Sequence, residues 1–313
     1  MRIRNLRGAA ARWFATAAAI SLVLCACSPN AAGAGGSGGK QLQVVAAENF
    51  WGSLVSQVGG SHVAVTSLVT DPNADPHEYE SSTNDARLFA TADYVVVNGA
   101  GYDDWARKLL DANPSSSRVV LSAADLFGKH PGDNPHLWYS PAYVRSMIDR
   151  ITSDLQRIDP GDSGQYASQR TALMRAVTPY EDKLTSIKRQ FHGVKVAATE
   201  DLVVYLVQAL GLELISPSSF MRAVAQGNDP SAADVIAFQR QLTAREASVL
   251  LYNTQTVTAV TTGMVDLARR SGVEVVGLSE TLQPATATFQ DWQVRQLTQV
   301  QSALAAAGSA SEQ

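Results

Sequence analysis

Two histidines that directly follow prolines are the residues of this chain best suited to chemistry. His77 lies in the Asp-Pro-His-Glu-Tyr-Glu stretch at 75–80, and His136 lies in the Asn-Pro-His-Leu-Trp stretch at 134–138. Because a proline fixes its own φ and restricts the residue before it, each imidazole leaves a stiff turn in a defined direction. Imidazole is the commonest side-chain ligand for transition metals. The pair therefore indicates a preorganised metal site, although one loop histidine alone is more often a solvated or capping residue.

Strand-like runs and helical patterns alternate along the body of the chain, which is typical of an α/β protein with parallel sheets. The expected strands form two sets of four, at 42–46, 62–69, 94–97 and 118–121, and at 194–198, 213–215, 248–252 and 274–278. Both sets share one order of strands, helices and Asp-Pro pairs, and matching features lie about 151 to 157 residues apart. We therefore predict two similar (βα)4-type metal-binding lobes, at 41–162 and 193–313.

A long helical pattern at 163–192 lies between the two lobes. Its apolar residues recur at helical spacing, at Tyr166, Leu173, Val177, Tyr180, Leu184, Ile187 and Phe191. Pro179 leaves two possibilities open. Either one helix ends there and another starts, with Thr178 as its cap, or a single helix continues with a kink. In both cases we expect a stiff linking helix between the lobes.

The ends of the expected strands bring candidate ligands from both lobes to one place. In open parallel sheets, ligands bind at the carboxyl ends of the strands. His77 follows the second strand of the first lobe, and His136 follows its fourth. Glu200 and Glu280 follow the first and last strands of the second lobe. Two imidazoles and two carboxylates would suit a divalent transition metal.

Each carboxylate also has an ordinary explanation. Glu200 could favour a helix N-terminus, where a negative charge meets the positive end of the helix dipole, and Glu280 could be a surface cap. Asp201 would replace Glu200 as a ligand if the register differed by one residue. Glu78 and Glu80 are interpreted as hydrogen-bond partners of the histidines or as caps, because a ligating histidine needs an acceptor for its other ring nitrogen.

The first 26 residues resemble the signal peptide of a bacterial lipoprotein. Four arginines accompany an apolar run from Trp13 to Leu24, which is shorter than the roughly 20 residues of a membrane span. A small residue precedes Cys27, so Cys27 is predicted to be the lipidated residue, ahead of Cys25, which follows the bulky Leu24. The alternative is an ordinary secreted protein. Residues 27–40, rich in Gly and Ser, would form a flexible tether.

The composition excludes several classes of protein. The chain has two cysteines, both at the predicted cleavage site, so the mature protein lacks a disulfide, a Cys-based zinc site and a thiol nucleophile. The chain has 25 basic and 29 acidic residues, and loss of the four signal-peptide arginines leaves 21 basic residues and a net charge near −8. An acidic body without a Lys/Arg cluster argues against nucleic acid as a partner.

The two histidine motifs resemble those of the metal-binding solute-binding lipoproteins of bacterial ABC importers, a family specific for zinc or manganese. The similarity runs from about residue 41 to 305 and is closest in the first lobe. It implies two lobes on a backbone helix, with metal ligands at His77, His136, Glu200 and Glu280. The third ligand of that family is His in zinc-type members and often Glu in manganese-type members. Its fourth is usually Asp, so Glu280 departs from the pattern.

The resemblance implies a receptor that carries Mn²⁺ or Zn²⁺ as cargo and delivers it to an ABC permease with its ATPase. We expect a monomer without catalytic activity, lipid-anchored on the extracytoplasmic face of the cell membrane. Two carboxylates beside two imidazoles form an oxygen-rich set that favours manganese slightly. The loop before His136 also lacks the His-rich insertion of many zinc-type members.

Two other functions stay open on the sequence alone. A metal-dependent envelope hydrolase would need an open coordination position and a general base, and the chain lacks His-Glu-x-x-His and Walker motifs. An adhesin could use the same fold as a binding module. A site saturated by protein ligands would favour the receptor, whereas a metal-bound water near a free carboxylate would favour the hydrolase.

Overall fold

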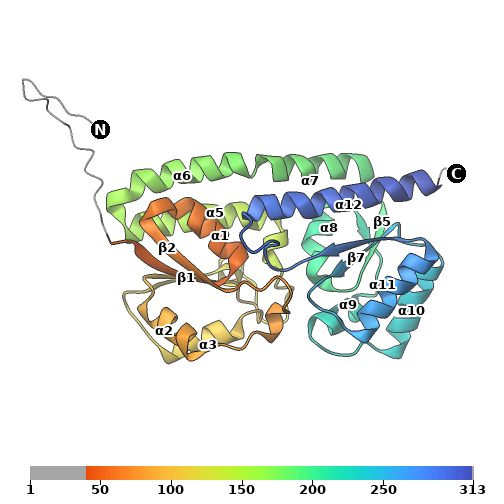
Figure 1. The fold of residues 1–313 in the computed structure, drawn as a ribbon, viewed down its shortest axis with the longest axis horizontal. Helices are drawn as coiled ribbons and strands as arrows, with labels where there is room; N and C mark the ends of the chain where they lie inside the picture. The colour runs from red at the N-terminus through yellow and green to blue at the C-terminus, as the bar shows by residue number, and fades with distance from the viewer. Residues whose placement is uncertain (1–39, 312–313) are drawn as a thin grey trace, which may run out of the picture. The chain divides into compact units, whose positions relative to one another are not determined.

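The computed structural model describes residues 40–311, in which eight strands form two parallel sheets (Figure 1). The first sheet has the order β2-β1-β3-β4, with β1 at Leu42–Glu48, β2 at Val63–Val69, β3 at Tyr94–Val97 and β4 at Val119–Ser122. The second has the order β6-β5-β7-β8, with β5 at Lys195–Ala198, β6 at Glu213–Leu214, β7 at Val249–Asn253 and β8 at Glu274–Leu278. The shared strand order confirms the prediction of two similar α/β lobes.

Helices alternate with the strands along these residues. The α-helices are α1 (Asn49–Gly59), α2 (Thr83–Thr91), α3 (Asp104–Ala112), α4 (Ala123–Leu126), α5 (Pro141–Ile158), α6 (Ser163–Ala176), α7 (Thr178–Phe191), α8 (Val204–Leu210), α9 (Ser218–Ala225), α10 (Ala232–Thr243), α11 (Ala259–Ser271) and α12 (Phe289–Ser311). The short 3-10 helices are η1 (Gly60–His62), η2 (Pro76–Glu78), η3 (Leu137–Tyr139), η4 (Pro160–Asp162) and η5 (Asp201–Val203).

The middle residues of the central strands are apolar because both faces of each sheet are covered. In β1, Val44 belongs to the core that includes α1, whereas Val45 belongs to the core that includes Phe89 of α2. Successive residues of a strand point to opposite faces, so a strand buried on both sides has no position for a polar side chain until it ends. The loops at the carboxyl ends of the strands are therefore the places where polar groups can gather.

One continuous apolar core joins the two lobes. It includes Val44 and Tyr94 of the first sheet, Val196 and Leu251 of the second, and Trp292 of α12. Helix α12 runs beside α7 (Figure 1), and it also contacts α1 of the first lobe. The chain from residue 39 onwards accordingly forms one compact unit. The limits proposed for the lobes and the linking helix, at 41–162, 163–192 and 193–313, therefore stay predictions.

The region predicted as a linking helix contains α6 and α7, which lie end to end with Val177 between them (Figure 1). The backbone N–H of Val177 still donates to a carbonyl of α6, so the hydrogen-bond ladder continues up to the junction. The hydroxyl of Thr178 also donates back to α6 and does not cap α7. The junction is thus a local interruption near Pro179, which has no N–H to donate, and not a capped start of a separate helix.

Some predictions concern residues outside those that the structure describes. The signal peptide, Cys27 and nearly all of the tether lie in residues 1–39. Among residues 40–311, no helix is both long and apolar enough to cross a membrane.

One acid is buried in the first lobe where β1 ends. Glu48 is fully buried and lies beside Asp103, whose carboxylate accepts the backbone N–H groups of Asn98 and Gly99 at 2.7 Å each. Burial, followed by the charge of Asp103, raises the pKa of Glu48 well above its ordinary value. Tyr102, the other titratable group near Glu48, also has a raised pKa, caused first by its burial. Burial therefore favours the protonated, neutral form of Glu48 in the folded protein.

We predict that Glu48→Gln stabilises the metal-free protein at neutral pH. Above the ordinary carboxyl pKa, the unfolded wild-type chain loses a proton that the folded chain keeps, so wild-type stability falls as pH rises towards the raised pKa. The advantage of the glutamine variant should grow by up to about 1.4 kcal/mol per pH unit in that window and vanish below it. Thermal unfolding between pH 4 and 8 measures this, with the exposed Glu80→Gln as control. An equal pH slope for wild type and Glu48→Gln would contradict it.

Candidate metal centre

His77 is positioned by a short turn after β2. It is the middle residue of η2, and Asp75 is the N-cap residue of this element. The Asp75 carboxylate accepts the backbone N–H of His77 at 2.9 Å. The imidazole stands edge-on to the ring of Tyr102, with 4.6 Å between the ring centroids. The turn is built from local contacts of Asp, Pro and His, which is why the sequence motif alone indicates it.

His136 is positioned by the corresponding turn after β4 and is fully buried. The side-chain oxygen of Asn134 accepts the backbone N–H of His136 at 2.9 Å and lies 2.9 Å from Nδ1 of its ring. The amide nitrogen of Asn134 donates to the carbonyl of Asp201 at 2.7 Å, which fixes the orientation of the amide. Nδ1 of His136 therefore carries the proton, and Nε2 presents a lone pair.

Glu200 and Glu280 lie directly beyond strands of the second sheet. Glu200 follows β5 and precedes η5, Glu280 follows β8, and their exposed fractions are 2% and 0%. The backbone N–H of Glu280 donates to Oε1 of Gln255 at 2.7 Å. Nε2 of Gln255 donates to the carbonyl of Ala74 at 2.6 Å, just before η2. Gln255 thus ties the loop of one carboxylate to the histidine turn of the other lobe.

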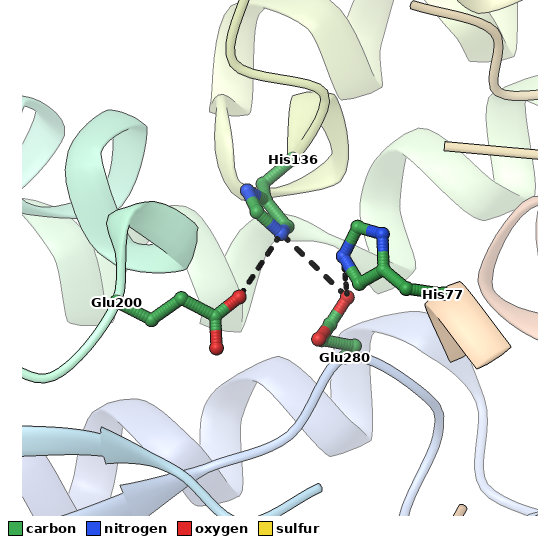
Figure 2. Close-up of side chains that lie close together, drawn as sticks. All are labelled: His77, His136, Glu200 and Glu280. Atoms are coloured by element: carbon green, nitrogen blue, oxygen red, sulfur yellow. Dashed lines mark ion pairs between the residues drawn. The ribbon is translucent and has the colours of Figure 1, made fainter. Parts of the chain in front are cut away.

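The structure brings all four predicted ligands together (Figure 2), and one donor atom of each lies within 4.8 Å of the others. Oε2 of Glu280 is 3.6 Å from Nε2 of both His77 and His136, and Oε1 of Glu200 is 3.7 Å from Nε2 of His136. The two Nε2 atoms and Glu200 Oε1 are buried without a hydrogen-bond partner. Because buried polar atoms are nearly always paired, unpaired donors that face one point indicate a cation site.

The two carboxyl groups have opposite protonation at neutral pH. Burial, followed by the charge of Glu280, raises the pKa of Glu200 to about 8. Burial also disfavours charge on Glu280, but His77 and His136 outweigh it and lower the pKa of Glu280 to about 2. Without a cation, Glu280 is ionised and Glu200 holds a proton. A cation at this point would favour ionisation of both groups.

Tyr102 and Asn253 contact the carboxylates, and sequence reasoning missed both. The hydroxyl of Tyr102 donates to Oε2 of Glu280 at 2.8 Å, and burial together with Glu280 raises the pKa of Tyr102, so the hydroxyl keeps its proton. The side-chain nitrogen of Asn253 donates to both Glu200 and Glu280. Tyr102 follows β3 and Asn253 ends β7. The same argument from strand ends that selected the four ligands could have identified them.

Three other acids that the sequence raised as candidates lie outside the cluster. Oδ1 of Asp201 is 3.5 Å from Nδ1 of His136, the nitrogen opposite the one that faces the cluster. The alternative in which Asp201 replaces Glu200 is therefore not the arrangement found. Glu78 and Glu80 are exposed, and the residues that open the two Pro-His motifs hydrogen-bond the histidines instead.

A cavity of about 620 Å³ leads to the histidine side of the cluster. Its lining includes His77 and His136 but neither Glu200 nor Glu280. The charged residues of the lining are Asp75, Glu78, Asp133, Asp201 and Arg222. An excess of acids at the mouth of a cleft raises the local concentration of cations, so this side is the natural entrance for an ion.

A second group of metal-ligating side chains is satisfied by its own contacts. Nδ1 of His62 lies 2.7 Å from Asp162, and the Tyr166 hydroxyl donates to Asp159 at 2.8 Å. His62 and Asp162 are about one-third exposed. The first contact ties η1 to η4, and the second ties Asp159 to α6, so the donor atoms of His62, Asp159 and Asp162 already have partners.

The chain is similar to known proteins of metal uptake. Residues 44–303 match the model of the family described as zinc-uptake complex component A, periplasmic (ZnuA). The chain is 24% identical over 204 residues to the manganese-binding lipoprotein MntA of Halalkalibacterium halodurans, an alignment that covers 63% of this chain and 66% of the relative. The chain therefore spans just under two thirds of that relative's length.

Solved structures share the fold. A manganese-bound periplasmic metal-binding protein of Candidatus Liberibacter asiaticus has a TM-score of 0.69 at 17% identity, with 85% of this chain and 100% of that chain covered. The periplasmic zinc-binding protein TroA of Treponema pallidum also has a TM-score of 0.69 at 17% identity, with 85% and 99% covered. Since the family model spans most of the chain, this protein belongs to the zinc-uptake complex component A (ZnuA) family.

Proposed function

We propose that the chain is the extracytoplasmic solute-binding lipoprotein of an ABC importer and captures Mn²⁺ or Zn²⁺ between its two lobes. The proposed ligand atoms are Nε2 of His77, Nε2 of His136, Oε1 of Glu200 and Oε2 of Glu280. The observation that carries the proposal is the convergence of these buried donors, three of which have no hydrogen-bond partner among the described residues.

A divalent transition metal ion suits this donor set in size and charge. Ligand atoms about 2.1 Å from a four-coordinate ion lie about 3.4 Å apart, and three separations in the cluster are 3.6–3.7 Å. Two ionised carboxylates neutralise a double positive charge, and the imidazoles bind in their neutral form. Mixed nitrogen and oxygen donors suit zinc or manganese better than calcium or magnesium, which prefer oxygen alone.

Capture, rather than hydrolysis, is the function that the family supports. The family is that of a component of an uptake complex, not of an enzyme. Relatives of this chain are named for binding manganese or zinc. We therefore set aside the metal-dependent hydrolase that the sequence alone left open, and no reaction is assigned to the chain.

An uptake component must pass its cargo to a membrane protein. We propose that the partner is an ABC permease with its ATPase, and that lipid on Cys27 holds the monomeric receptor at the extracytoplasmic face of the membrane. The tether at 27–40 would let the folded part reach the permease. The acidic composition supports binding of cations rather than of nucleic acid.

We predict that His77→Ala and His136→Ala each lose most metal binding, by more than the roughly 10- to 100-fold that removal of an outer partner costs. Glu280→Gln keeps the shape of the side chain but removes a charge between the histidines, so it should also weaken binding strongly. Titration calorimetry with Mn²⁺ and with Zn²⁺ measures the affinity of each variant. Glu80→Ala, an exposed acid three residues after His77 that does not line the cavity, is the matched control. Wild-type affinity in both histidine variants would place the site elsewhere.

We predict that deletion of the protein lowers cellular manganese more than cellular zinc. Two carboxylates favour the harder ion, although zinc outranks manganese in affinity at almost any such site. Affinity in the test tube therefore does not decide the cargo. The cargo is decided by elemental analysis, which compares the manganese and zinc contents of the deletion strain and of the complemented strain. A selective fall in zinc would reverse the preference for manganese and leave the receptor itself intact.

We predict that the mature protein begins at Cys27 and carries lipid there. The short apolar run and the small Ala26 before the cysteine are the reasons. Mass spectrometry of the protein taken from its own membrane measures the N-terminal mass, with Cys27→Ala as the control that should lose the modification. An unmodified chain that begins downstream of Cys27 would rule out the anchor.

A further inference from the structure

Asn253 binds both carboxylates of the cluster at once. It is the last residue of β7 and is 2% exposed. Its side-chain nitrogen lies 2.8 Å from Oε2 of Glu200 and 2.6 Å from Oε1 of Glu280. An amide NH₂ group has two hydrogens, so it can donate one to each carboxylate.

The orientation of the Asn253 amide is fixed by its surroundings. Its oxygen accepts the backbone N–H of Gln255 at 2.9 Å, so the nitrogen must be the atom that faces the carboxylates. The hydroxyl oxygen of Thr256 also lies 2.9 Å from that nitrogen, and the same hydroxyl donates to Asp75 at 3.1 Å. The amide is therefore held from behind by the loop that follows β7.

Asn253 and the histidines contact different oxygens of each carboxylate. The oxygens that accept from Asn253 are Oε2 of Glu200 and Oε1 of Glu280. The oxygens that approach the histidines are Oε1 of Glu200 and Oε2 of Glu280. A carboxylate can bind a metal through one oxygen or through both. Asn253 thus holds one oxygen of each group away from the histidines, and the other oxygen, which on Glu280 also accepts from Tyr102 at 2.8 Å, is the one that faces them.

We propose that Asn253 sets the metal specificity of the site by restricting Glu200 and Glu280 to one metal-binding oxygen each. Four single-atom donors match the four-coordinate geometry of zinc, whereas manganese takes sites with more oxygen ligands, so the contacts of Asn253 offset part of the preference for manganese that two carboxylates give. Asn253 thus limits the two carboxylates to one metal-binding oxygen each. It acts as a positioning residue and does not touch the ion. This inference rests on the proposed function, because it assumes that the cluster binds the cargo.

The test compares Asn253→Leu, which has the same branched shape but no donor, with wild type. Both proteins are titrated with Zn²⁺ and Mn²⁺ in competition with a chelator. The variant should lose about 10- to 100-fold in zinc affinity and distinctly less in manganese affinity, so that the ratio of the two affinities shifts towards manganese. X-ray absorption at the zinc edge should show four nitrogen or oxygen neighbours in wild type and more in the variant, because the freed oxygens can chelate.

Thr254→Val is the matched control, since Thr254 is the next residue and its hydroxyl donates to the carbonyl of Leu278. It should leave both the affinity ratio and the neighbour number unchanged. Asn253→Ser is the second variant if the leucine variant does not fold, because serine is too short to bridge the two carboxylates.

An unchanged affinity ratio in a folded Asn253 variant that still binds metal would overturn the inference. Five or more protein donors around zinc in the wild-type spectrum would overturn it as well, whether or not either variant folds. Failure of the proposed function looks different, since the wild-type protein would then bind neither metal.

Discussion

The arrangement depends on two carboxyl groups, Glu200 and Glu280, that are buried side by side and cannot both be charged without a cation. Burial and mutual repulsion raise the pKa of Glu200 to about 8, whereas the nearby histidines offset burial and lower the pKa of Glu280 to about 2. The metal-free site therefore stores a proton on Glu200. A divalent ion removes the repulsion, so its binding should displace that proton. Without a cation the core accommodates this acidic pair because Glu200 keeps a proton and Glu280 accepts hydrogen bonds from Tyr102 and Asn253.

Neither lobe contains the site by itself, since each supplies two of the four donors. Several hydrogen bonds join the two lobes at the proposed ligands or at residues adjacent to them in the chain. Tyr102 donates to Glu280 at 2.8 Å, Asn134 donates to the carbonyl of Asp201 at 2.7 Å, and the Tyr139 hydroxyl donates to the carbonyl of Ser279 at 2.8 Å. Any movement of one lobe against the other would strain these contacts and separate the donors. On the proposed function, capture and release of the ion would be linked to the relative position of the lobes.

Local patterns predict much of this protein. The eight strands lie close to the apolar runs from which they were predicted. This agreement arises because a strand covered on both faces must be apolar and must end at polar residues. The two Pro-His turns are local too, and the positions of Glu200 and Glu280 after strands identify them. The sequence did not decide between Glu200 and Asp201, since one residue of register reverses the direction of a side chain.

Contacts between distant residues explain what the sequence could not predict. Asn253 meets Glu200 across 53 residues and Glu280 across 27, and Tyr102 meets Glu280 across 178. The position of both residues at strand ends places them near the site, but no spacing rule shows which carboxylate each of them contacts. From the sequence, Glu78 and Glu80 are interpreted as partners of the histidines or as caps, but both residues are exposed, and Asp75 and Asn134 form the hydrogen bonds to the histidines. The break between α6 and α7 at Val177 depends on the missing N–H of Pro179. The periodicity of the apolar residues is the same with or without this break, so it does not predict it.

The most direct test of the central claim is the position of the ion in crystals of the metal-loaded protein, measured by anomalous scattering at the absorption edge of manganese and of zinc. We expect one strong peak about 2.0–2.2 Å from Nε2 of His77 and of His136, Oε1 of Glu200 and Oε2 of Glu280. A peak bound by other residues, with these four donors left unligated, would contradict it.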